Sequence, residues 1–199
     1  MAGNSSKMVI FAAMAGNGLI AITKAIAAAY TGSSAMFSEA IHSAVDTGNQ
    51  GLLLYGLHRA KRSPDQRHPY GYGRELYFWA FVVALLVFAV GSGVSIYEGI
   101  HKIMDPEPIQ NPMVNFVVLG AALVFEGAAW YIAFKEFKRS VKESNYFAAV
   151  AASKDPSIFA VLLEDSAAML GLMVALIGLG LGLWLDIPEL DGVASVVIG

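Results

Sequence analysis

Four polar residues stand at helical spacing inside an otherwise apolar stretch of the sequence. Glu39, His42, Asp46 and Asn49 are separated by three, four and three residues, so on a helix they form one polar stripe. His42 and Asp46 are one turn apart, and an imidazole nitrogen and a carboxylate oxygen at that spacing can bind one cation, at about 2.0–2.2 Å each for zinc. The stripe could equally bind a partner helix, and the pair alone does not decide between these readings.

A second acidic group lies in the apolar stretch Val161–Gly171, where Glu164 and Asp165 are adjacent. Consecutive helical residues point about 100° apart, so the two carboxyl groups cannot share a face. One can face the polar stripe, whereas the other needs a different partner, a water-filled cavity or a proton. The small residues around them would let a neighbouring helix approach closely. We therefore expect this pair at a helix interface.

Two further charged residues stand alone in apolar surroundings. Lys24 can reach the membrane surface or pair with Glu39, and we favour a structural pairing over ion gating. Glu126 has no charge near it in the sequence that could neutralise it. It could relay protons, act as an accessory metal ligand or form a structural hydrogen bond.

The composition indicates what kind of protein must position these residues. The chain has 199 residues, of which 56% are hydrophobic and 15% are charged, and its mean hydropathy is +0.57. A soluble domain usually carries about a quarter charged residues, so a cytosolic globular enzyme is disfavoured. The net charge of −3 disfavours a nucleic-acid partner. Because there is no cysteine, a metal site must use His, Asp, Glu or backbone oxygen.

The apolar residues cluster into stretches of the length that crosses a bilayer, which is about 20 residues of helix. The sequence predicts an all-α, polytopic membrane helix bundle, a single transmembrane domain over residues 1–199 without a soluble domain. The expected helices cover about residues 8–30, 35–58, 76–100, 113–134 and 157–185, with a sixth opening near 193. Because the sixth run ends so soon, we expect a six-helix domain whose sixth helix is truncated.

The basic residues are distributed asymmetrically among the loops. Of the 13 Lys and Arg, all but Lys24 and Lys102 lie before the first helix, around the loop after the second, or in the segment after the fourth. Lys and Arg accumulate on the cytoplasmic side of membrane proteins. We therefore expect a multi-pass protein with a cytoplasmic N-terminus; the sequence does not indicate which membrane it occupies.

Together these segments resemble the transmembrane domain of the cation diffusion facilitator family, whose members are antiporters of zinc and related divalent metals with protons. The resemblance covers the whole sequence, and the loop motif HPYGYGRE is its most specific part. The segments that carry it are Asn17–Lys24, Tyr30–Ala35, Ser38–Asp46 and His68–Glu75. Lys154–Ser157 and Leu162–Ala168 are most similar to the zinc transporter 9-like branch.

The resemblance implies a metal site of four ligands, two at i and i+4 in each of the second and fifth helices. His42, Asp46 and Asp165 match three positions, whereas the fourth falls on Val161, which cannot bind a metal. Water or a neighbouring polar group would complete the shell, and the loss of a ligand shifts the expectation toward manganese or iron(II). Zinc remains possible with three protein ligands and water. The candidate accessory ligands or proton relays are Glu164, Asn49, Asn17, Glu39 and Glu126.

The function implied by the resemblance is export of zinc, or of manganese or iron, from the cytoplasm in exchange for protons by alternating access. The protein would then be a homodimer in the lipid bilayer, not an enzyme, with no cofactor besides the transported cation. The alternative is a membrane metal sensor or scaffold that does not transport, and the missing fourth ligand is its best support.

Overall fold

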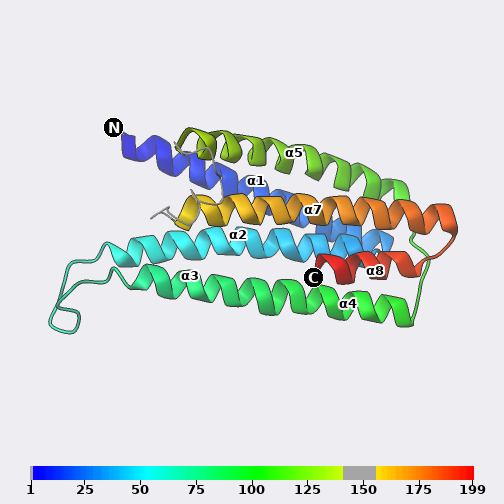
Figure 1. Ribbon diagram of the computed structural model, residues 1–199, viewed down its shortest axis with the longest axis horizontal. Helices are drawn as coiled ribbons and strands as arrows, with labels where there is room; N and C mark the ends of the chain where they lie inside the picture. The colour runs from blue at the N-terminus through cyan, green and yellow to red at the C-terminus, as the bar shows by residue number, and fades with distance from the viewer. Residues whose placement is uncertain (1, 141–155) are drawn as a thin grey trace.

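The computed structural model describes residues 2–140 and 156–199, and its helices run side by side along one long axis (Figure 1). No strand occurs within these ranges, which confirms the all-α prediction for them. The elements in chain order are α1 (Ala2–Thr31), α2 (Ser34–Ala60), α3 (Glu75–Leu86), η1 (Val87–Ser92), α4 (Gly93–Met104), α5 (Pro112–Ser140), α7 (Pro156–Leu185) and α8 (Glu189–Ile198).

Most expected helices are present with shifted ends, and the helix expected over 76–100 is present as one helical stretch, Glu75–Met104. A six-residue π-helix, η1, interrupts it, and α4 continues to Met104. A π-turn is wider than an α-turn, and its hydrogen-bond register is not visible as a change in apolar periodicity. The last helix also begins earlier than expected, at Glu189 rather than near 193. That the bundle has six helices with a truncated sixth stays a prediction.

The turn between α1 and α2 follows directly from its sequence. Gly32 has a φ of +69°, the left-handed conformation that ends many helices. Its N–H bonds to the carbonyl of Ala28 at 2.9 Å. Ser33 then caps α2, since its hydroxyl accepts the N–H of Met36 at 3.1 Å. These residues return α2 antiparallel to α1, so the polar stripe of α2 lies beside α1.

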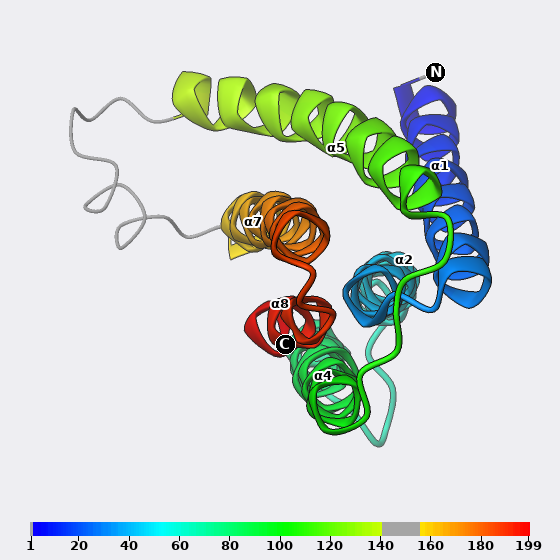
Figure 2. The ribbon, with the colours of Figure 1, turned by 90° about the vertical axis from the view of Figure 1, so that its right-hand side faces the viewer.

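α2 is the central helix of the bundle (Figure 2). It contacts α1, α3, α4, α7 and α8, while α5 packs on α1 and α7. The buried apolar core between these helices consists mostly of small side chains, and its members include Ala27, Ala28, Ala35, Met36, Leu119, Ala122, Leu172, Ala175, Leu179 and Ala194. Small residues let helix backbones approach closely, which is how helices associate where no water drives them together.

The packing of α4 against α8 is closest where two glycines meet. A Cβ placed at Gly99 would lie 2.6 Å from the carbonyl oxygen of Gly192, and one placed at Gly192 would lie 2.7 Å from that of Gly99. Only glycine fits at such a contact. α4 and α8 therefore form a tightly packed pair that borders α2.

The outer surface of the bundle is apolar. Phe81 is 65% exposed and Trp184 is 80% exposed, as is typical of side chains that face lipid. Within the described residues, three helical stretches are long and apolar enough to cross a bilayer, namely Glu75–Met104, Pro112–Ile132 and Leu163–Leu185. The protein is thus a multi-pass membrane protein.

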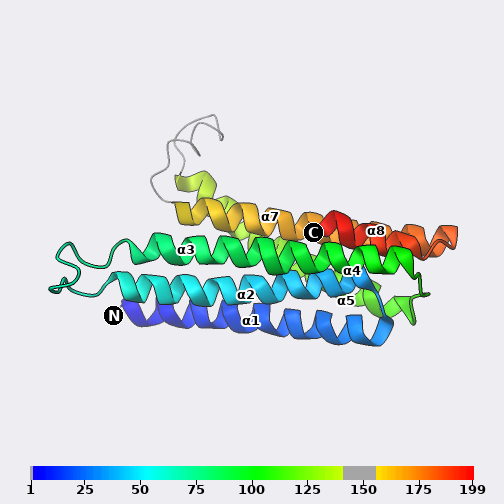
Figure 3. The ribbon, with the colours of Figure 1, turned by 90° about the horizontal axis from the view of Figure 1, so that it is seen from below.

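The two ends of the bundle differ in the connections that they carry. The N-terminus, the loop 61–74, the end of α5 and the start of α7 lie at one end (Figures 1 and 3). The short connections 32–33, 105–111 and 186–188 lie at the other end. The N-terminus and the basic loop 61–74 therefore lie at the same end of the bundle, as one orientation across a membrane requires.

Candidate functional site

A cavity of about 290 Å³ lies between α1, α2, α5 and α7. Carboxyl groups from three of these helices line it, together with amide side chains and apolar residues such as Ile20 and Phe125. The polar lining residues are Asn17, Ser43, Asp46, Asn49, Gln50, Glu126, Glu164 and Asp165. An acidic cavity inside an apolar bundle suits a small cation.

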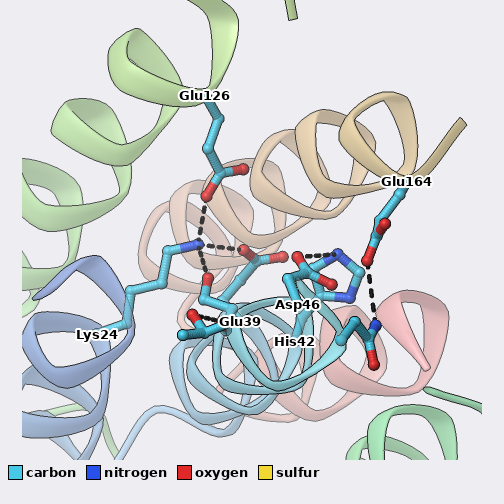
Figure 4. A network of polar contacts seen from close by, with 9 residues as sticks. Lys24, Glu39, His42, Asp46, Glu126 and Glu164 are labelled. Atoms are coloured by element: carbon cyan, nitrogen blue, oxygen red, sulfur yellow. Dashed lines mark hydrogen bonds and ion pairs between the residues drawn. The ribbon is translucent and has the colours of Figure 1, made fainter. Parts of the chain in front are cut away.

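The wall contributed by α2 includes Asp46 and Asn49, two of the four residues of the polar stripe expected from the sequence, and Figure 4 shows Asp46 beside His42. His42 Nε2 lies 3.5 Å from Asp46 Oδ2, one helical turn away. Asp46 and Asn49 line the cavity, whereas His42 and Glu39 are not among its lining residues. Asp46 is therefore the member of the expected pair that faces the cavity, and His42 lies directly behind it.

The wall contributed by α7 carries both adjacent acidic residues. Glu164 Oε1 accepts a hydrogen bond from Asn49 Nδ2 at 3.1 Å, which joins α7 to α2. Asp165 also lines the cavity. Both adjacent residues thus line the same cavity. Trp130 of α5 donates to the Ser166 hydroxyl at 2.8 Å and holds α5 against this wall.

Behind the cavity, one buried lysine joins three helices (Figure 4). Lys24 Nζ of α1 lies 3.0 Å from Glu39 Oε2 of α2 and 3.0 Å from Glu126 Oε1 of α5, and it donates to the Ser43 hydroxyl at 2.9 Å. The pairing with Glu39 is the structural role favoured from the sequence. Because an unpaired charge is costly in such surroundings, the two carboxylates are what allow a fully buried lysine here.

The Glu39 carboxylate fits against α7 because the residue opposite it, Gly171, has no side chain. A Cβ placed at Gly171 would lie 2.5 Å from Glu39 Oε1. Within the described part of the chain, buried side-chain atoms without a hydrogen-bond partner include Glu39 Oε1, His42 Nε2 and Glu126 Oε2. Each of these belongs to the α2 stripe or to the lysine network, next to the cavity.

The three expected metal ligands are not gathered in this structure. Over residues 2–140 and 156–199, no three His, Asp or Glu side chains come close enough together to hold one metal ion. Asp46 and Asp165 border the same cavity, and His42 contacts Asp46. Val161 lies in α7, but its side chain is outside the described residues. The ligand set stays a prediction.

A second buried polar cluster, which was not expected from the sequence, lies at the N-terminal end of α2. Asp191, which was expected in a loop, is in α8 and is 1% exposed. Its carboxylate accepts the Ser33 hydroxyl at 2.6 Å, the Ser34 N–H at 2.6 Å and the Ser34 hydroxyl at 2.9 Å. A carboxylate at a helix N-terminus is favourable. Pro188 immediately before Glu189 was the available signal that a helix starts there.

The loop between α2 and α3 is folded on its own hydrogen bonds. Asp65 accepts the N–H groups of Arg67 and His68 at 2.9 and 2.7 Å and the hydroxyl of Tyr72 at 2.6 Å. The Tyr72 hydrogen bond, followed by that from His68, lowers the pKa of the Asp65 carboxyl group. At the membrane end of the loop, Arg59 forms two hydrogen bonds with Glu75. These contacts hold the loop in one conformation and join its two ends.

Comparison with known proteins decides the family. Residues 10–199 match the family described as the cation efflux transmembrane domain. The chain belongs to the cation diffusion facilitator family. This facilitator is 38% identical over 193 residues to the mouse protein named proton-coupled zinc antiporter SLC30A9, mitochondrial, a match that covers 96% of this chain and 34% of the relative. The human protein of that name matches equally.

More distant relatives of this facilitator come from a plant and a bacterium. Metal tolerance protein C4 of Arabidopsis thaliana is 33% identical over 169 residues, covering 84% of this chain and 37% of the relative. Zinc transporter ZitB of Yersinia pestis is 31% identical over 120 residues, covering 59% of this chain and 37% of the relative. The facilitator thus spans about a third of the length of these curated relatives.

The SLC30A9 relatives confirm the branch that the sequence analysis favoured. The family description and the relatives' names are those of transporters, which agrees with the expectation that this facilitator is not an enzyme. The structure contains an acidic cavity between α2 and α7, and binding a cation there requires no covalent chemistry.

Proposed function

We propose that this chain moves a divalent metal cation, zinc first, out of the cytoplasm in exchange for protons. The observation that carries the proposal is the cavity between α1, α2, α5 and α7, which four carboxyl groups line. Ionisable residues inside a membrane bundle are expensive and mark ion pathways. The relatives named as zinc antiporters and zinc transporters support the same cargo.

The ligands in this proposal are His42, Asp46 and Asp165. Asp46 and Asp165 already face the cavity, and His42 Nε2 is buried, unpartnered and 3.5 Å from Asp46. A small rotation of α2 or of the His42 side chain would bring the imidazole to the cation that the two carboxylates attract. Asn49, Glu164 and Asn17 are the accessory groups at the cavity wall, and the candidate proton carriers are Glu126, which also lines the cavity, and Glu39, which does not.

Proton exchange follows from competition for the same atoms. A metal ion needs a neutral imidazole and ionised carboxylates, so metal binding releases protons and protonation releases the metal. If the site opens alternately to the two sides, the side richer in protons expels the cation. His42, Asp46 and Asp165 then serve as both metal ligands and proton acceptors in alternating access.

The choice of cargo depends on the fourth position of the site. Val161 is one turn before Asp165 in α7, where the family resemblance places a ligand. With valine there, water or an amide oxygen must complete the shell. Zinc accepts three protein ligands and water, whereas manganese and iron(II) take more oxygen ligands. The missing ligand thus favours manganese or iron(II), whereas the names of the relatives favour zinc; we propose zinc as the main cargo, with manganese and iron(II) as the ions to compare with it.

The proposed direction places the basic end of the bundle in the cytoplasm. The N-terminus and the loop 61–74 lie at that end, and this loop carries Lys61, Arg62, Arg67 and Arg74. Basic residues near helix ends set orientation. A second copy of the chain, expected from the resemblance, would complete a homodimer in the bilayer.

The experiment is uptake into proteoliposomes that contain the full chain, with zinc, manganese, iron(II) and cadmium compared under an imposed proton gradient. The proposal predicts uptake of at least zinc that stops when the gradient is collapsed. Uptake of none of the four ions would refute transport.

A metal sensor or scaffold remains the second candidate, because the described residues hold no three ligating groups together. A sensor would bind zinc in the same vesicles without moving it, and a scaffold need not bind it. Calorimetric binding measured beside the flux therefore separates the three cases.

A further inference from the structure

Lys24 is a fixed positive charge at the back of an acidic cavity. It does not line the cavity, but two groups that do line it contact its ammonium, the Ser43 hydroxyl and the Glu126 carboxylate. Of these two, Glu126 carries the charge. The Glu126 side chain extends from α5 toward Lys24 (Figure 4), and Glu126 also lines the cavity.

The two oxygens of Glu126 are in different situations. Oε1 lies 3.0 Å from Lys24 Nζ, whereas Oε2 is buried and has no hydrogen-bond partner among the described residues. A carboxylate can accept from both oxygens. Oε2 is therefore an unused acceptor atom, and the residue that carries it lines the cavity.

A purely structural ion pair would not need this arrangement. Glu39 is fully buried, lies 3.0 Å from Lys24 and is sufficient to balance its charge. Glu39 is also absent from the cavity lining, so a Lys24–Glu39 pair alone would be insulated from the cavity. The second carboxylate adds a contact between the buried lysine and the place where a cargo ion would sit.

We propose that Lys24 is a built-in competitor of the cargo. Its ammonium and the transported divalent cation share Glu126, so a cation that enters the cavity weakens the Lys24–Glu126 bond between α1 and α5. Lys24 keeps its bond to Glu39, so α1 remains joined to α2 while the contact between α1 and α5 weakens. This inference rests on the proposed transport function and adds a residue that sets cation affinity and links it to helix movement.

The test is calorimetric binding of zinc to the full chain in detergent, with transport measured in proteoliposomes. Lys24→Gln removes the competitor, so zinc should bind roughly tenfold more tightly, within the range of typical coupling between sites. Turnover should fall, because the cargo is then released less readily. Lys24→Arg keeps the charge and can hold Glu126 with two donors, so its zinc affinity should equal that of the unmodified chain or be lower.

Lys102→Gln is the matched control. Lys102 is also buried, but its ammonium donates to the carbonyl of Gly32 at 2.9 Å. Gly32 lies in the turn just before α2 and does not line the cavity. This variant should bind zinc as the unmodified chain does. In a Glu126→Gln background, Lys24→Gln should no longer change the zinc affinity, because the shared group is gone.

The outcomes separate this inference from the proposed function. If the unmodified chain neither binds nor moves zinc or manganese, both are wrong. If it transports zinc but Lys24→Gln binds zinc no more tightly than Lys102→Gln does, only the competition is wrong. An equal gain in affinity with and without Glu126 would also overturn it, because the lysine would then act through general charge alone. Should Lys24→Gln fail to fold, tighter zinc binding by Lys24→Arg would contradict the inference.

Discussion

Asn49 of α2 donates a hydrogen bond to Glu164 of α7 at 3.1 Å, on the wall of the acidic cavity. The bond gives Glu164 a fixed partner. Asp165, the next residue, also lines the cavity and forms no hydrogen bond or ion pair with the described part of the chain. Of the two adjacent carboxyl groups, Asp165 is thus the one that is free to bind a cation.

Replacing Asp165 should therefore weaken metal binding more than replacing Glu164. We expect Asp165→Asn to lower zinc affinity by more than tenfold, whereas Glu164→Gln, which acts beside the ligand, should lower it by about tenfold at most. Calorimetric titration of the two variants measures both effects. A larger loss in Glu164→Gln would make Glu164 the ligand and Asp165 the accessory group.

Val161 should decide which ion the site prefers. Val161 is one turn before Asp165, so Val161→His adds a nitrogen ligand to the same face of the helix. A nitrogen ligand raises the affinity for zinc more than that for manganese. We expect the ratio of zinc affinity to manganese affinity to rise by about tenfold. Leu163→His is the control, since Leu163 is 66% exposed on the outer surface of α7. An unchanged ratio in Val161→His would show that this residue does not face the site.

Gly171 should be intolerant of even a methyl group. Gly171→Ala would place a Cβ 2.5 Å from Glu39 Oε1 and displace the carboxylate that pairs with Lys24. We expect a loss of about 1–3 kcal/mol in the free energy of unfolding, measured in detergent. Gly180→Ala on the same helix has nothing within 4 Å of its new Cβ and should be neutral or slightly stabilising. Equal stability of the two variants would refute the Gly171–Glu39 contact.

Acid should loosen the loop between α2 and α3. Folding lowers the pKa of Asp65, first through the Tyr72 hydroxyl and then through the His68 N–H, so its hydrogen bonds stabilise the loop above the ordinary Asp pKa. That stability is lost as the pH falls through the lowered pKa of Asp65. Tyr72→Phe should raise this pKa toward its ordinary value, as NMR titration of the carboxyl carbon would show. Tyr70→Phe, at a fully exposed tyrosine, should leave it unchanged.

The helices were largely predictable because long apolar runs and short turn motifs determine them. The gap expected between the first two helices, after residue 30 and before residue 35, contains the turn at Gly32 and Ser33, and Pro112 begins α5 one residue before the expected start. The π-helix Val87–Ser92 was not predictable, since apolar residues fill every face there and leave no periodicity to shift. The early start of α8 was missed because Glu189 and Asp191 were taken for loop residues.

The site was predictable only within single helices. The spacing of His42 and Asp46 correctly placed them one turn apart on α2. Which residue of another helix faces them depends on packing between distant segments. Glu126 meets Lys24 across 102 positions and Asp191 meets Ser33 across 158, and neither pairing leaves a local pattern in the sequence.

The most direct test of the account is zinc flux through Asp46→Ala. Asp46 both lines the cavity and contacts His42, so its loss removes a ligand while the Lys24 network of the bundle remains. Zinc uptake and the opposing proton movement should be recorded together in the same proteoliposomes, with equal amounts of folded protein. We predict that the unmodified chain couples the two movements and that Asp46→Ala abolishes both. Zinc uptake by Asp46→Ala at the rate of the unmodified chain would contradict a transport site between α2 and α7.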